Sequence, residues 1–223
     1  MKGNFFAEAD KKRASELRKD QFTYLCITMG AIERRDQSVL PETYLELESQ
    51  SDTKHEYLNG QMVAMAGASV AHSIISNNMR FSLTSLARQA GCIVLDSDVK
   101  VFIDTDTHFL YPDASVVCED IAYFKGRTDS ITNPKIIIEV LSDSTEDYDR
   151  GRKFAMYRSI PSFEEYVLIS QKKQHVEVFS KKGENIWQIR TYDDADGSCF
   201  LESFQIAIPF GEIYSDVPNA KAK

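Results

Sequence analysis

The longest regular hydrophobic pattern of the chain lies between Ser69 and Gln89. Its apolar residues recur at steps of four, four and three, and they are Ile75, Met79, Leu83 and Leu86. Such spacing places the side chains on one face of a helix. Ser69 belongs to the residue types that cap helix N-termini, and Gly91 to those that end helices. The pattern therefore predicts an amphipathic helix over 69–89.

A short run, Lys135–Leu141, carries the strongest strand signal. Its sequence, KIIIEVL, is β-branched and almost wholly apolar, which is typical of a central strand buried on both faces. Shorter apolar runs predict further strands at 61–66, 92–95, 99–103 and 109–117. Runs separated by polar turns predict a strand-rich C-terminal part, with strands at 164–170, 175–180, 185–192 and 200–208.

Two shorter helices and one tight turn complete the predicted order. Ser38 caps a predicted helix that ends near Leu47, and Ser144 caps another that covers 145–158. Asn59–Gly60 is a strong turn signal, because both residue types tolerate positive φ. This order predicts an α/β (α+β) domain, in which a mixed central sheet is flanked by helices and followed by extra C-terminal antiparallel strands.

Residues 1–36 match no motif and are interpreted as an N-terminal extension, either a flexible arm or a docking helix. We expect one folded domain over 37–215 and a C-terminal tail over 216–223. The N-terminus lacks the apolar segment of a secretory signal. No run of about 18 apolar residues occurs, so no membrane span is expected.

Composition narrows the class of protein further. Four cysteines lack the spacing of metal ligands, which predicts reduced thiols in a cytoplasmic protein and no zinc site: Cys26, Cys92, Cys118 and Cys199. The net charge of −8 argues against a strong, non-specific nucleic-acid binder. The cations nevertheless gather in two segments, as Lys125, Arg127 and Lys135 and as Arg150, Arg152, Lys153 and Arg158. They form either a phosphate-binding surface or a solvated charged face.

Two carboxylates stand out because they interrupt apolar strands. Glu139 lies in the middle of the predicted central strand, where an unpaired carboxylate costs several kcal/mol. It therefore needs either a core cation or a metal ion as a partner. Asp113 follows Pro112 at the entry to another apolar run, where it is either a turn-capping residue or a second site carboxylate.

The separation of Asp113 from Glu139, 26 residues, is enough for two neighbouring strands and their connection. Two carboxylates that converge from such strands repel each other, and a divalent cation removes that repulsion. Oxygen ligands that leave coordination positions open suit Mg²⁺ or Mn²⁺. Such an ion can polarise a phosphoryl oxygen and activate a water molecule.

Three more residues are candidates for the same chemistry. Lys153 shares a predicted helix face with Glu146, Arg150 and Tyr157, from which it could orient water and stabilise negative charge, or simply be solvated. Glu56 precedes the Asn59–Gly60 turn and is either a third acidic ligand from the first helical region or a helix-end carboxylate. His72 contacts a phosphate or metal-bound water, or is a satisfied core histidine.

These motifs, in this order, resemble those of a restriction-endonuclease-like family that is abundant in cyanobacteria and belongs to the PD-(D/E)XK nuclease superfamily. The residues that carry the resemblance are Glu56–Gly60, His72, Tyr111–Asp113, Ile138–Ser142, Lys153–Tyr157 and Glu165–Ile169. The resemblance covers about 38–215. It implies a restriction-endonuclease-like core and Mg²⁺-dependent phosphodiester hydrolysis, with Asp113, Glu139 and Glu56 as metal ligands.

One departure from the superfamily pattern bears on activity. The usual lysine falls two residues after the acidic strand residue, and that position is Leu141 here. The resemblance implies that Lys153 replaces it from the following helix.

The sequence thus leaves three functions open. The first is an endonuclease that cuts DNA with Mg²⁺ or Mn²⁺; the resemblance also suggests a homodimer, because restriction-type enzymes often cut two strands with two copies. The second is a catalytically inactive binding or assembly module, in which Lys153 or Arg150 neutralises the two carboxylates. The third is a metal-dependent hydrolase of a smaller phosphorylated substrate.

Overall fold

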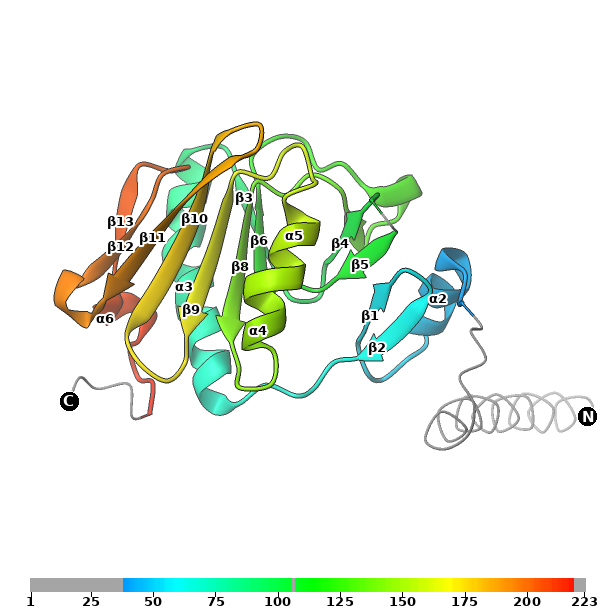
Figure 1. The fold of residues 1–223 in the computed structure, drawn as a ribbon, viewed down its shortest axis with the longest axis horizontal. Helices are drawn as coiled ribbons and strands as arrows, with labels where there is room; N and C mark the ends of the chain where they lie inside the picture. The colour runs from blue at the N-terminus through cyan, green and yellow to red at the C-terminus, as the bar shows by residue number, and fades with distance from the viewer. Residues whose placement is uncertain (1–37, 106, 219–223) are drawn as a thin grey trace, which may run out of the picture. The chain divides into compact units, whose positions relative to one another are not determined.

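The computed structural model describes residues 38–105 and 107–218, so the extension predicted for residues 1–36 lies outside the described residues. A mixed six-stranded sheet forms the centre of this part of the chain, in the order β11–β10–β9–β8–β6–β3 (Figure 1). The strand bounds are β3 Ile93–Asp96, β6 Ala114–Val117, β8 Ile136–Leu141, β9 Glu165–Ser170, β10 His175–Gly183 and β11 Ile186–Asp193. The strand β8 is parallel to β9 and antiparallel to β6. A mixed α+β fold, as the sequence predicted, is therefore confirmed.

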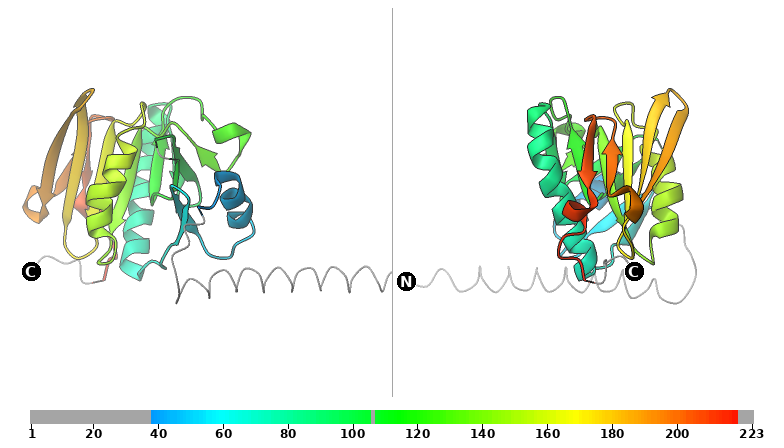
Figure 2. Two further views of the ribbon diagram at one scale, coloured as in Figure 1. Left: turned by 45° about the vertical axis from the view of Figure 1, so that its right-hand side comes forward. Right: turned by 90° about the vertical axis from the view of Figure 1, so that its left-hand side faces the viewer.

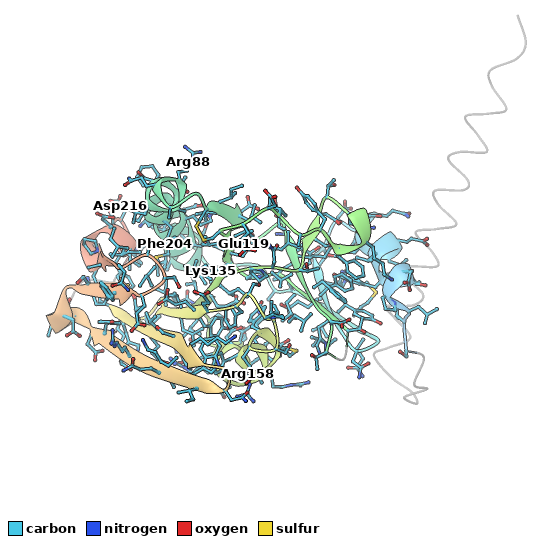
Figure 3. All side chains as sticks on the ribbon, turned by 90° about the horizontal axis from the view of Figure 1, so that it is seen from above. Arg88, Glu119, Lys135, Arg158, Phe204 and Asp216 are labelled. Carbon is cyan, nitrogen blue, oxygen red and sulfur yellow. A yellow bond between two sulfur atoms is a disulfide. The ribbon has the colours of Figure 1, made fainter. Side chains whose placement is uncertain are left out.

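Strand β8 is buried along its whole length, as its apolar sequence predicts. Ile136, Ile138 and Val140 face one core, which also contains the buried stripe of helix α3 (Val70–Gln89). Ile137 and Leu141 face a second core, which contains Tyr157. Figure 2 shows the two helical layers on opposite sides of the sheet, with α3 on one side and the helical segment of residues 146–157 on the other. Figure 3 places Arg88 and Arg158 on these opposite sides.

Helix α3 confirms the predicted amphipathic helix. The Ser69 side chain caps it by accepting a hydrogen bond from the backbone N–H of His72 at 3.1 Å. Its fully buried stripe is Ile75, Met79, Leu83 and Ala87. Because this stripe continues to Ala87, Leu86 is only half-buried.

A second sheet has five strands in the order β2–β1–β5–β4–β7. Their bounds are β1 His55–Leu58, β2 Gln61–Ala64, β4 Lys100–Ile103, β5 His108–Leu110 and β7 Ser130–Ile131. Asn59 and Gly60 have positive φ values of 45° and 90° and join β1 to β2 in a two-residue hairpin. Helix α2 (Pro41–Glu48) precedes this sheet, and Leu40 rather than Ser38 is its N-cap residue.

The prediction that Glu56 lies in a helical region is wrong. Helix α2 ends at Glu48, and the Asn59–Gly60 turn pairs β1 with β2, where Glu56 is opposite Val63. The backbone hydrogen bonds of this segment therefore serve a hairpin.

The predicted single strand over 109–117 is two strands in different sheets. Strand β5 belongs to the smaller sheet and β6 to the larger one, and the bend Tyr111–Asp113 connects them. Pro112 cannot donate a backbone hydrogen bond, which favours a break in the ladder at this point. Asp113 consequently lies where the chain crosses from one sheet to the other.

The predicted helix over 145–158 is broken into three helical pieces. They are α4 (Glu146–Tyr148), a π-helical turn η3 (Asp149–Lys153) and α5 (Phe154–Tyr157). Ser144 does not cap it; Thr145 is the N-cap residue and makes no side-chain capping bond. The predicted strand over 200–208 is a hairpin of β12 (Ser198–Leu201) and β13 (Ile206–Pro209), which α6 (Phe210–Ile213) follows.

The prediction of four reduced thiols is wrong for Cys92 and Cys118, which form a disulfide, seen as the yellow bond in Figure 3. Strands β3 and β6 pair antiparallel with Ile93 opposite Val117, so the two cysteines occupy the next opposed positions. The strand register that brings them together cannot be read from their spacing in sequence. Cys199 is a free, buried thiol.

In the described part of the chain, residues 38–105 and 107–218, no helix combines the length and apolar character needed to cross a bilayer.

The β1–β2 hairpin yields a first prediction. A side chain at Gly60 would be strained by the positive φ and would overlap Oγ of Ser38. We expect Gly60→Ala to lower the free energy of unfolding by about 1–3 kcal/mol, measured by urea denaturation. Gly67→Ala is the control, because a Cβ there meets nothing within 4 Å, and it should change stability by less than about 1 kcal/mol. Equal losses in the two variants would contradict this account of the turn.

Candidate active site

Asp113 and Glu139 lie on adjacent strand segments, as their separation predicted. Ala114 of β6 is opposite Ile138 of β8, so the same register continued by one residue places Asp113 opposite Glu139. The backbone N–H of Val140 donates a hydrogen bond to Oδ2 of Asp113 at 2.7 Å. Hence the bend before β6 fixes one carboxylate beside the other.

Lys153 is surrounded by three carboxylates. Its Nζ donates a hydrogen bond to Oε1 of Glu139 at 3.0 Å and forms ion pairs with Oε1 of Glu56 at 3.2 Å and Oδ1 of Asp149 at 3.3 Å. All four residues are buried, with 6% or less of each exposed. The predicted placement of Lys153 next to Glu139 is therefore what the structure shows.

Tyrosine hydroxyls complete the hydrogen bonding around this lysine. The hydroxyl of Tyr157 donates to Glu139 at 3.1 Å, and that of Tyr148 donates to Oε2 of Glu56 at 3.3 Å. The Tyr148 ring also lies 5.8 Å from Nζ of Lys153, within the range of a cation–π contact. These hydroxyls supply hydrogen-bond donors to carboxylates that are largely shielded from water.

His72 reaches the same place from the start of α3. Its Nε2 lies 3.1 Å from Oδ2 of Asp113, and the two side chains are 16% and 18% exposed. This pair is therefore the more accessible part of the cluster, and Lys153 lies in the more buried part.

Burial alone would lower the pKa of His72. The hydrogen bond to Asp113 and the charges of Asp113 and Asp149 outweigh burial, so the pKa is raised above its ordinary value. The protonated imidazole is consequently favoured beside Asp113.

The buried charges shift one another strongly. Burial is the largest influence on Glu139 and raises its pKa well above the usual range; Lys153 opposes this shift, and the neighbouring carboxylates Asp149 and Asp113 reinforce it. For Lys153, burial favours the neutral amine, but the charges of three carboxylates prevail and raise its pKa well above 10.5. Lys153 is therefore a permanent cation at neutral pH.

The cluster holds more acidic than basic groups. Glu56, Asp113, Glu139 and Asp149 face Lys153 and His72, so full ionisation of all six leaves two negative charges in excess (four minus two). Burial makes this excess unfavourable unless a proton or a cation compensates for it. An excess of carboxylates at one place is the donor chemistry that hard divalent cations require.

Asp113 and Glu139 fit a cation as a pair of ligands, since Mg²⁺ commonly uses one or two carboxylates and keeps water or substrate oxygens elsewhere. Among the residues that the structure describes, no three His, Cys, Asp or Glu side chains come together closely enough to hold a metal ion. Glu56 contacts Lys153 instead. Its role as a third metal ligand stays a prediction.

The shared helix face predicted for Lys153 is only partly present. Arg150 points elsewhere and pairs with Glu146 and with Glu177 of β10. Arg150 and Lys153 both lie in the π-helical turn, which rotates less per residue than an α-helix. Two residues three positions apart are therefore less well aligned on one face than in an α-helix.

Asp149, which we did not predict, takes the inward position. The signal that could have revealed it is the spacing of Asp149, Lys153 and Tyr157 at steps of four.

The predicted cationic cluster is mostly neutralised. Four of its seven members pair with carboxylates outside the site: Lys125, Arg127, Lys135 and Arg150. Arg152 and Arg158 are exposed and form no ion pair with any described residue. These ion pairs favour a solvated charged face over a phosphate-binding surface.

Comparisons with known proteins agree with this fold. The model of the Uma2 family, described as "Putative restriction endonuclease", matches residues 41–209. Two uncharacterized proteins of Synechocystis sp. are similar: slr1290 is 36% identical over 156 residues, 70% of this chain and 81% of its own length. The other, sll1609, is 33% identical over 144 residues, 65% and 81% of the two chains.

A crystal structure from Anabaena variabilis ATCC 29413, described as a putative nuclease belonging to DUF820, superposes with a TM-score of 0.63. It covers 78% of this chain and 96% of that chain at 17% sequence identity, so the likeness concerns the fold alone. Together these findings confirm the resemblance to restriction-endonuclease-like proteins.

The ion pairs of Lys153 generate a second prediction. Lys153→Met leaves Glu139, Glu56 and Asp149 buried without a cation, which should cost about 3–5 kcal/mol of unfolding free energy at pH 7. The pKa values of Glu139 and Asp149 are raised by burial and lowered by Lys153, so without the lysine they should lie further above their unfolded values. The folded state then binds the extra protons, so the deficit should shrink as pH falls toward about 4.5.

Urea denaturation of both proteins at pH 7 and at pH 5 measures this difference. Lys172→Met is the matched control, because the Lys172–Asp143 pair is exposed and should contribute less than about 1 kcal/mol at either pH. A Lys153→Met deficit that is independent of pH would contradict the assignment of its cause to unpaired carboxylates.

Proposed function

This chain belongs to the Uma2 family of putative restriction endonucleases, and we propose that it is a nuclease that hydrolyses DNA phosphodiester bonds with a divalent cation. The observation that carries the proposal is the placement of Asp113 opposite Glu139, with Lys153 at 3.0 Å from the latter. Two carboxylates beside a permanently charged lysine supply both a cation site and a second positive charge for a phosphate group.

Asp113 and Glu139 would hold Mg²⁺ or Mn²⁺. When bound, such an ion polarises a phosphoryl oxygen and lowers the pKa of a coordinated water. The excess negative charge of the cluster supports this assignment, because it makes the cluster attract cations. Asp113 is already oriented by the N–H of Val140 and by His72.

Lys153 would act on the phosphate. Its ammonium group is held within a buried cluster, where electrostatic stabilisation of developing negative charge is stronger than in water. Access is from the side of Asp113 and His72, the least buried members of the cluster. His72 would orient Asp113 and, from this edge, lie near an approaching phosphate.

A second candidate function is a catalytically inactive binding or assembly module. One observation favours it: Lys153 and His72 already provide partners for all four carboxylates. In addition, Leu141 occupies the usual lysine position of the superfamily. The two functions differ in whether a divalent cation binds.

A third prediction tests cleavage. In Mg²⁺ or Mn²⁺, the wild-type protein should cut duplex or branched DNA, and Glu139→Gln should reduce kcat on the order of 100-fold or more. Glu164→Gln is the control, because Glu164 pairs with Lys135 on the surface and should retain the wild-type rate. Gel analysis of labelled DNA measures both rates. Unchanged cleavage by Glu139→Gln would reject the assigned site. Paired cuts in both strands would be the pattern expected of a homodimer, in which each copy cuts one strand.

A fourth prediction separates the two candidate functions. Calorimetric titration of the wild-type protein with Mn²⁺ should show binding below millimolar concentration, and Asp113→Asn should weaken it at least tenfold. The loss is expected because one of two anionic ligands becomes a neutral amide. If the wild-type protein binds no Mn²⁺ at millimolar concentration, the inactive module is supported.

A further inference from the structure

The four carboxylates of the site, of which Glu56, Glu139 and Asp149 are buried and Asp113 is partly exposed, differ in what holds them. Asp113 and Glu139 come from opposed positions of the larger sheet. Glu56 comes from β1 of the smaller sheet, and Asp149 comes from the π-helical turn that also carries Lys153. Lys153 contacts Glu139, Glu56 and Asp149 from three different elements, whereas Asp113 contacts His72.

From these contacts we propose that Glu56 and Asp149 are positioning residues that hold Lys153, and that only Asp113 and Glu139 take the divalent cation. This inference rests on the proposed nuclease function. It assigns Glu56 a role different from the metal ligand that its family resemblance implies, and it assigns a role to Asp149.

The first argument is the geometry around Lys153. Nζ of Lys153 hydrogen-bonds to Glu139 at 3.0 Å, while Glu56 and Asp149 lie at 3.2 and 3.3 Å. If Glu139 turns toward a cation, Lys153 loses that partner. The two remaining carboxylates are already in ion-pair range, so a small shift of the ammonium group keeps it neutralised and in place.

The second argument concerns Asp149. It is 2% exposed, and its buried Oδ1 faces the lysine without the alignment of a hydrogen bond to any described residue. An oxygen atom in such a position has unused accepting capacity. If Glu139 no longer accepts a hydrogen bond from Lys153, the same N–H of the ammonium group can donate to Oδ1 of Asp149.

The third argument concerns Glu56. Its Oε2 accepts a hydrogen bond from Tyr148 at 3.3 Å, and its Oε1 lies 3.5 Å from the backbone N of Tyr111. Donors on both oxygens fix this carboxylate toward Lys153. Among residues 38–105 and 107–218, no group of three acidic or histidine side chains is compact enough for one ion, as a shared site with Glu56 would require.

The experiment compares isosteric variants at two readouts, the Mn²⁺ dissociation constant by calorimetry and kcat on duplex DNA. Asp149→Asn and Glu56→Gln should keep the dissociation constant within threefold and lower kcat at least 30-fold. Asp113→Asn should instead weaken Mn²⁺ at least tenfold. Asp147→Asn is the matched control, an exposed aspartate two residues away, and it should change neither readout.

Three outcomes would overturn the division. Asp149→Asn or Glu56→Gln could weaken Mn²⁺ binding as much as Asp113→Asn, which would make the residue that was changed a cation ligand. Both variants could retain wild-type kcat, which would remove the positioning role. Wild-type protein that binds no Mn²⁺ and cuts no DNA would reject the proposed function itself, and the division would fall with it.

A crystal of the wild-type protein soaked in Mn²⁺ gives a test that needs no variant to fold. The anomalous peak should lie within coordination distance of Asp113 and Glu139, with Lys153 against Glu56 and Asp149. An Mn²⁺ ion that is coordinated by Glu56 or by Asp149 would overturn the proposal.

Discussion

The burial of Lys153 among Glu56, Glu139 and Asp149 is the constraint on which the rest of the site depends. Removing a charge from water is costly, and a buried charge is tolerated only when its partners are held in good geometry. Here the partners come from a central strand, a hairpin of the second sheet and a helical turn. The lysine can stay buried only if all three elements are in place, so the site and the fold require each other.

This requirement explains the irregular parts of the structure. The bend at Tyr111–Asp113 interrupts what would otherwise be one strand, and it brings Asp113 to the end of β6. The π-helical turn Asp149–Lys153 interrupts a regular helix; its two end residues pair with each other, and Lys153 also pairs with Glu139. Irregular backbone of this kind is common at functional sites, where a side chain must be aimed at the expense of local regularity.

The same irregularities mark the limit of what the sequence predicts. Periodicity identifies α3 and β8 well, because each buries a complete stripe or a complete strand. Glu139 and Lys153 can be recognised as partners, since a carboxylate inside an apolar strand needs a cation.

Periodicity alone did not single out Asp149 among the acidic residues of this helical segment, although its four-residue spacing from Lys153 is compatible with a shared helix face. Nor could it reveal that Glu56 lies in a strand, or that Cys92 and Cys118 are opposed: both depend on which strands pair.

The electrostatic balance of the site links the two candidate functions. Without a divalent cation, Lys153 and His72 neutralise part of the acidic cluster, which allows the chain to fold with four carboxylates close together. The remaining excess of negative charge can be compensated in two ways. A cation can bind, or Glu139 or Asp149 can take up a proton, which the raised pKa values of these two carboxyl groups favour. A stable metal-free fold is therefore expected of an active enzyme as well as of an inactive relative. An active enzyme and an inactive relative would differ in whether Glu139 can exchange its ion pair with Lys153 for a bound cation. Glu56 and Asp149 lower the free-energy cost of this exchange, because they keep the ammonium group paired throughout.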